Sequence, residues 1–153
     1  MTQINNDVEF KQAITSLSYQ QQRVIAAKFV EHVIPLCSDE RLKRVVDAAS
    51  NENASQDELS AALKSAKAVT LDSHTRCGAE GNWTDQAGYF VARAAVAAVT
   101  PEAQSKGGGP AWQAAMSCRM AQTSIQIDND DASAVELTEN KWQYQILSDF
   151  LNS

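Results

Sequence analysis

The sequence predicts an all-α protein, a single compact bundle of about seven helices over residues 1–153, packed around an alanine-rich central helix. Apolar residues recur every three or four positions along most of the chain, and almost no stretch alternates strictly as a half-buried strand would. Polar turns separate these segments. No segment repeats at a period of about 20 to 50 residues and no long linker is present, so one domain is expected.

The first two helices are predicted from capping residues and apolar spacing. Asn6 or Asp7 begins the first, because either side chain can accept hydrogen bonds from the unpaired first-turn amides. The second, residues 18–36, carries an apolar stripe at helical spacing. It should end or bend near Ile34, because Pro35 lacks an amide proton and disfavours helix in the residue before it.

Two further helices follow in the same way. A short helix capped by Ser38 places the apolar residues of 42–49 on one face. Ser55 and Glu58 have the spacing of a capping box, in which each side chain satisfies a backbone amide at a helix start. The fourth helix therefore begins there, and we expect it to run to about Arg76.

The fifth helix is expected to be central. Thr84 would cap it, and its body, residues 89–99, is apolar on nearly every side, as in a helix surrounded by others. A sixth helix from Ala111 should turn four side chains inward: Trp112, Ala115, Met116 and Met120. A last helix, which carries Trp142, follows the acidic turn 128–131.

The composition excludes several functional classes. Hydrophobic residues make up 44% and charged residues 21%, as in ordinary globular proteins. The net charge of -6 disfavours nucleic-acid binding, and the densest basic run, residues 41–44, is flanked by acidic residues. The longest nearly apolar run, residues 89–99, is interrupted by Arg93 and is too short to span a membrane.

The expected location is the cytoplasm. Residues 1–8 are polar and acidic, without the basic start and apolar stretch of a secretory signal. The odd number of cysteines, Cys37, Cys77 and Cys118, is most simply explained by reduced thiols.

The acidic turn resembles a calcium-binding loop only in part. Asp128, Asp130 and Glu139 occupy the first, third and twelfth positions of such a loop. However, Ala132 and Ser133 stand where a ligand and the turn glycine belong. Helix capping by Asp130 or Asp131 explains these residues without a metal.

Metal, phosphate and nucleophile motifs are weak elsewhere. His74 and Cys77 lie one helical turn apart, where they could bind a metal or form a thiol–base pair. Chance adjacency is the simpler explanation of this spacing. The glycines 107–109 lack a following Gly-Lys-Ser/Thr and read as a flexible loop. His32, on an apolar stripe, is expected to be a neutral imidazole held by one hydrogen bond. We therefore expect no cofactor, no metal and no enzyme.

Arg93 is the most informative single residue, because it interrupts a helix that should be buried and cannot lose its charge. It must either reach the edge of the bundle or pair with a carboxylate or helix-end carbonyls inside. We expect a structural ion pair rather than an anion-binding site, and therefore expect Arg93→Leu to lower thermal stability.

One family resemblance is visible. The segment 26–36, with its His-Val-Ile-Pro-Leu element, followed by Arg41 and the stripe 45–49, resembles the opening of bacterial immunity proteins associated with toxin systems. The small-residue helix 92–98 and a C-terminal pattern are also similar, the latter formed by Glu139, Trp142, Gln143 and Leu147. The resemblance implies a cytoplasmic protein that neutralises a toxin by binding it, without catalytic residues.

The sequence therefore predicts a non-enzymatic protein that binds another protein, partly through the acidic residues Asp128, Asp130 and Asp131. The resemblance implies that this partner is a toxin. No nucleic acid or membrane is expected as a partner, and no oligomeric state is predicted. The alternative is a helical bundle that binds a small molecule or a cofactor. Its pocket would be lined by Trp112, Met116, Met120 and Trp142, with Arg93 or His32 as the polar group.

Overall fold

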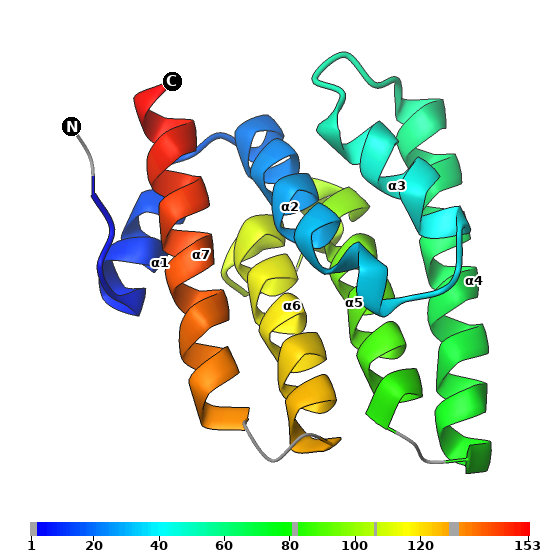
Figure 1. Ribbon diagram of the computed structural model, residues 1–153. Helices are drawn as coiled ribbons and strands as arrows, with labels where there is room; N and C mark the ends of the chain where they lie inside the picture. Colours follow the sequence, from blue (N-terminus) through cyan, green and yellow to red (C-terminus); the bar gives the residue numbers. More distant parts are fainter. Residues whose placement is uncertain (1–2, 81–82, 106, 129–131) are drawn as a thin grey trace.

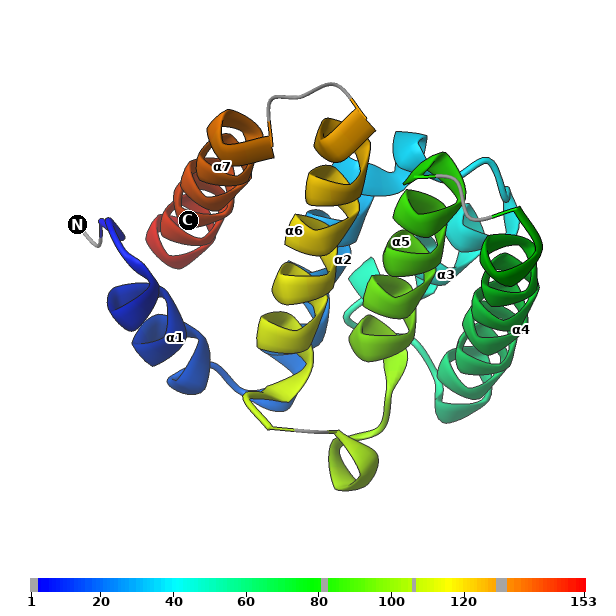
Figure 2. The same ribbon diagram turned by 90° about the horizontal axis from the view of Figure 1, so that it is seen from below.

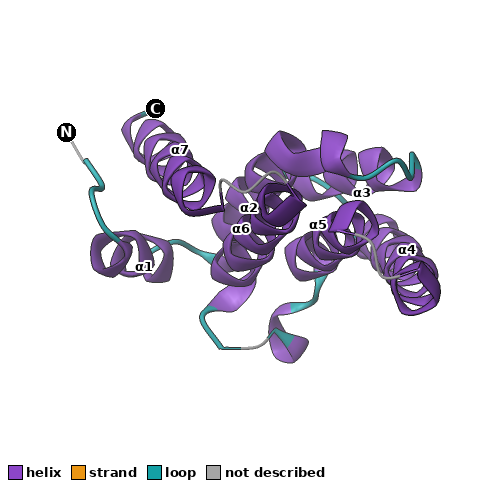
Figure 3. Cartoon of the chain, turned by 60° about the horizontal axis from the view of Figure 1, so that its bottom comes forward, coloured by secondary structure: helices purple, strands orange, loops and turns teal. Residues whose placement is uncertain are grey.

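The computed structural model describes residues 3–80, 83–105, 107–128 and 132–153, with side chains for 3–75, 85–105, 107–125 and 138–153. Within these ranges the chain forms α-helices and two short 3-10 helices and no strand, so the predicted fold class is confirmed (Figure 3). The elements are α1 (Asp7–Thr15), α2 (Tyr19–Val33), η1 (Ile34–Leu36), α3 (Arg41–Ser50), α4 (Gln56–Glu80), α5 (Trp83–Val99), η2 (Glu102–Gln104), α6 (Gly109–Asp128) and α7 (Ala132–Asn152).

The helices form two uneven layers. α4, α5, α6 and α7 lie side by side in a row, with α2 and α3 across one face (Figure 1). α2 packs on α6 and α5, and α3 packs on α4 and α2. η2 lies on the other side of the row, away from α2 and α3 (Figure 2). Among the described residues, no helix is both long and apolar enough to cross a membrane.

Several helix ends follow the predicted capping chemistry. The Asn6 side chain accepts a hydrogen bond from the Glu9 amide at 2.9 Å, so α1 begins as expected. The Ser55 hydroxyl accepts from the Glu58 amide at 3.1 Å at the start of α4. Pro35 lies in η1, where α2 has already ended.

Other boundaries differ from the prediction. α4 continues past Arg76 to Glu80, because a glycine inside a helix costs only about 1 kcal/mol relative to alanine. α3 begins at Arg41, whose amide donates to the Asp39 carboxylate at 3.0 Å, so Ser38 is not the cap. α5 begins at Trp83, one residue before the expected cap.

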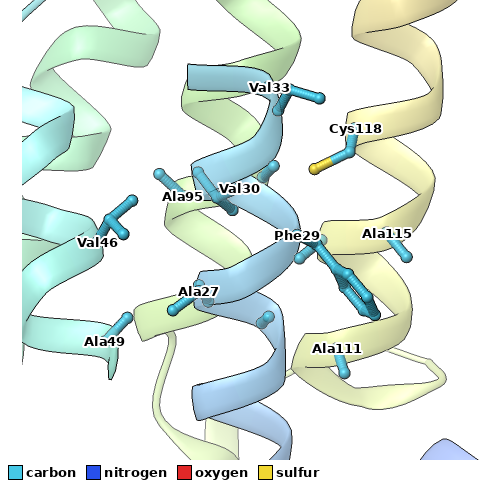
Figure 4. Packing of buried hydrophobic residues seen from close by; sticks show 14 of the residues in the cluster. Ala27, Phe29, Val30, Val33, Val46, Ala49, Ala95, Ala111, Ala115 and Cys118 are labelled. Carbon is cyan, nitrogen blue, oxygen red and sulfur yellow. The ribbon is translucent and has the colours of Figure 1, made fainter. Parts of the chain in front are cut away.

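The core is built from small side chains at the α5–α6 contact. α5 has the most extensive packing of all the helices, mainly on α6 and α4, which confirms the expected central helix. Alanine lets two backbones approach closely, and Phe29 of α2 points into the space that Ala111 and Ala115 leave on α6 (Figure 4). The buried small residues of the two helices include Ala92, Ala94, Ala95, Ala98, Ala111, Ala114, Ala115, Cys118 and Ala121.

The buried face of α6 is displaced from the predicted one. Of the four side chains expected to face inward, Ala115 is fully buried and Trp112 and Met116 are half-buried against the core, whereas Met120 is 46% exposed. Ala111 and Cys118, which were not predicted, are also fully buried. The predicted stripe contained the larger apolar residues, but the contact with α5 selects the alanine face, since only small side chains fit between closely spaced helices.

Candidate functional site

An open groove is lined by residues of α4, α5 and α6 and by Gln104 and Ser105 at η2. η2 lies on the side of the helix row away from α2 and α3 (Figure 2). Its volume is about 480 Å³, which lies within the usual range for small-molecule sites. The lining residues are Lys67, Thr70, Leu71, His74, Tyr89, Arg93, Val96, Ala97, Thr100, Gln104, Ser105, Gln113 and Ser117.

Helical spacing explains why these residues share a surface. The lining residues of α4 span Lys67 to His74, two turns of one helix face, and those of α5 span Tyr89 to Thr100 in the same way. The two helices run in opposite directions side by side (Figure 1). The rings of His74 and Tyr89 touch, with centroids 5.5 Å apart, and so mark one end of the groove.

Arg93 is exposed on this groove, so the expected buried ion pair is wrong. α5 is not covered on every side, because α2, α3, α4 and α6 leave one stripe of it open to solvent. The Arg93 guanidinium lies 5.8 Å from the centroid of the Tyr89 ring, a cation–π contact that holds it over the groove.

The charge of the groove contrasts with the acidic chain. Lys67 and Arg93 contribute two positive charges, His74 adds an imidazole, and none of the described lining residues is acidic. Within the described part of the chain, neither Lys67 nor Arg93 has an ion-pair partner. Two unneutralised cations beside apolar side chains can therefore attract an anionic group.

A second cavity, of about 680 Å³, lies between residues 3–5 and α7. Its lining is largely polar and includes both Lys141 and Asp149. The two charges have opposite sign, so this cavity favours no one class of ligand.

A network of polar side chains, of which Arg119 and Gln143 are buried, joins α1, α6 and α7. Both terminal nitrogens of Arg119 donate to the Asp7 carboxylate, at 3.0 and 2.9 Å, and its Nε donates to Gln143 at 2.8 Å. The hydrogen bonds from Arg119 hold the pKa of Asp7 below its ordinary value, against the opposing effect of burial. Tyr144 also donates to Asp7, at 2.7 Å, and burial is the main reason that the pKa of Tyr144 rises to about 12.

The network continues to α2 through Glu139. Gln143 donates to the Glu139 carboxylate at 3.3 Å, and Nδ1 of His32 lies 3.2 Å from its other oxygen. Burial raises the pKa of Glu139, and the contact with His32 partly opposes that rise. The His32 ring stacks on Trp142, with centroids 3.6 Å apart. The partner of His32 is therefore a buried carboxylate, which its place on an apolar stripe did not reveal.

This network lacks the parts of a nucleophilic site. Cys118 lies near Glu139, but complete burial raises the pKa of its thiol well above the ordinary value, so the reactive thiolate is disfavoured. His32 and Glu139 do not line the groove. No group of three or more potential metal ligands occurs among the residues whose side chains are described. The contacts instead suit a structural link between α1, α2, α6 and α7.

The structure separates the other predicted site residues. Trp112 packs on Phe10, with ring centroids 6.1 Å apart, whereas Trp142 stacks on His32, and neither tryptophan lines the groove or the cavity beside α7. Asp128 is the last residue of α6, and its side chain lies outside the described ones. Asp130 and Asp131 also lie outside the described residues.

Sequence reasoning missed most of the groove, including Lys67, Thr70 and Tyr89. A signal existed, because Lys67, Leu71 and His74 follow one another at helical spacing. These residues can be assigned to a binding site only when the structure shows that no other helix covers the neighbouring face of α5.

The architecture defines an all-α helical protein with a basic surface groove. Comparison of the chain with protein-family models, with curated proteins and with solved structures finds no match.

Proposed function

We propose that this protein is a non-enzymatic binding protein that holds a small organic molecule in the groove between α4, α5 and α6. One observation carries the proposal: a groove of about 480 Å³ whose lining combines apolar side chains, hydrogen-bonding side chains and two basic side chains that form no ion pair within the described part of the chain. This is the usual make-up of a small-molecule site.

The exposed apolar surface around the groove supports the proposal. Leu71, at the groove, is 66% exposed, and Val96 and Ala97 are only half-buried. A ligand that covered these side chains would remove apolar surface from water, at about 25 cal/mol per Å². The hydroxyls of Thr70 and Thr100 donate to carbonyls of their own helices and keep lone pairs that can accept from a ligand.

Binding of a protein partner, such as a toxin, stays a prediction. The acidic loop expected to take part, residues 128–131, extends outside the described residues. The family resemblance remains its support, whereas the groove favours a small ligand.

A thermal-shift screen with a chemically diverse fragment library tests the proposal. Compounds that bind the folded state raise the melting temperature, by an amount that grows with the logarithm of their concentration relative to Kd. Ala97→Phe should fill the groove and abolish those shifts, whereas Ala61→Phe, at an exposed site of α4 outside the lining, should preserve them.

Circular dichroism of both variants confirms that each is folded. Hits that stabilise Ala97→Phe as well as they stabilise the unmodified protein would contradict the proposal, because they would bind elsewhere.

A further inference from the structure

The order of side chains along the groove indicates the kind of ligand that it takes. His74 and Tyr89 form an aromatic end, with ring centroids 5.5 Å apart. Arg93 is one turn from Tyr89, about 6 Å along the axis, and Lys67 is two turns from His74, about 10 Å. Since α4 and α5 run in opposite directions, Arg93 and Lys67 follow the aromatic end on the same side of it.

The far end of the groove is polar. Thr100 lies almost three turns beyond Tyr89, about 16 Å along the axis. Gln104 and Ser105, at η2, and Gln113 of α6 also line the groove. The lining thus changes from aromatic, through cationic, to uncharged hydrogen-bonding groups.

We propose that the ligand of the groove is an aromatic organic anion, with its ring packed on Tyr89 and His74 and its carboxylate or phosphate bound by Arg93 and Lys67. This inference rests on the proposed small-molecule function and adds its ligand class. Arginine presents a planar fork of donors that matches either anionic group, and lysine adds a second charge one turn further along.

Several observations favour an anion over a neutral or cationic ligand. Arg93 and Lys67 have no ion-pair partner in the described part of the chain. The contact with the Tyr89 ring, at 5.8 Å, orients the Arg93 guanidinium without neutralising it. An anion would supply the missing charge, whereas a cation would be repelled.

Isothermal titration calorimetry with three probes of one shape tests the ligand class: naphthoate, naphthyl phosphate and neutral naphthamide. At least one anion should bind about tenfold or more tightly than naphthamide, because hydrogen bonds between charged groups exceed neutral ones by that order. Comparison of the two anions identifies the preferred acid group.

Matched variants locate the interaction. Arg93→Gln and Lys67→Gln should each weaken anion binding about tenfold and leave naphthamide binding unchanged. Lys64→Gln, one turn from Lys67 on α4 but outside the lining, and Arg44→Gln, on α3, should change neither. Tyr89→Leu should weaken naphthoate more than octanoate, because octanoate has the carboxylate but no ring to pack on Tyr89.

The outcomes separate this inference from the function on which it rests. Naphthamide binding as tight as that of the anions, or unchanged anion binding by Arg93→Gln, would overturn the aromatic anion while the groove remains a binding site. If neither anion binds at millimolar concentration while neutral fragments still bind in the groove, the aromatic anion is again overturned and the groove remains a binding site. If no compound of any charge binds in the groove, both fail.

Discussion

The environment of Arg93 in the structure differs from the one that the sequence predicted. A charged side chain in an apolar helix predicted a buried ion pair, but the open face of α5 places the guanidinium over Tyr89 in solvent. Its importance should therefore lie in binding and not in folding.

The first prediction concerns that residue. Arg93→Leu should change the free energy of unfolding by no more than about 0.5 kcal/mol, because surface substitutions rarely do more. Thermal denaturation measures this. A loss of about 2 kcal/mol or more would restore the buried pairing expected from sequence.

Asp7 carries a stabilising charge, although its side chain is 48% exposed. Asp7→Asn should lower the free energy of unfolding by about 1 to 2 kcal/mol, because Arg119 loses its anionic partner. This loss is smaller than for a fully buried pair, because solvent screens Asp7. Asp47→Asn, at an exposed site of α3, is the control and should have little effect. Equal urea midpoints for the two variants would show that the Asp7 contact contributes nothing.

At the scale of elements, the helices were predictable because apolar period and capping are local properties. Asn6 and Pro35 marked boundaries that the structure confirms. The buried face of α6 was not predictable in this way, since the choice between its alanine face and its methionine face depends on the closeness of α5.

The close approach of α5 and α6 leads to the third prediction. Ala115→Leu should destabilise the protein by about 1 to 3 kcal/mol, because the added carbons have no space in a fully buried contact. Ala61→Leu, on the exposed face of α4, should be nearly neutral. Similar melting temperatures for the two variants would mean that this contact is loosely packed.

At the scale of the whole molecule, polar side chains tie the outer helices α1 and α7 to the centre. Glu139 makes stability depend on pH, because its side chain is almost completely buried and this burial raises its pKa. The folded protein therefore retains a proton on Glu139 at pH values where the unfolded chain has lost it.

The raised pKa of Glu139 fixes the direction in which stability changes with pH. As the pH rises above about 4.5, the ordinary value for glutamate, the Glu139 contribution to stability should fall until its raised folded pKa is passed. Glu139→Gln cannot ionise, so its stability relative to the unmodified protein should increase over this window. Urea unfolding at a series of pH values measures the difference, and parallel stability curves for the two proteins would contradict the raised pKa.

The groove is also a property of the whole molecule, and this explains why the sequence revealed only part of it. Arg93 was identified as a candidate because it broke an apolar pattern. Lys67 and Tyr89 break no pattern, and their role depends on which faces of α4 and α5 no other helix covers.

The central claim is that the groove binds a small organic ligand, and heteronuclear NMR with the fragment hits tests it most directly. We predict that amide shifts cluster at groove residues such as Leu71, Ala97 and Ser117, and disappear in Ala97→Phe. Shifts that cluster instead at the cavity beside α7, or that persist unchanged in Ala97→Phe, would contradict it.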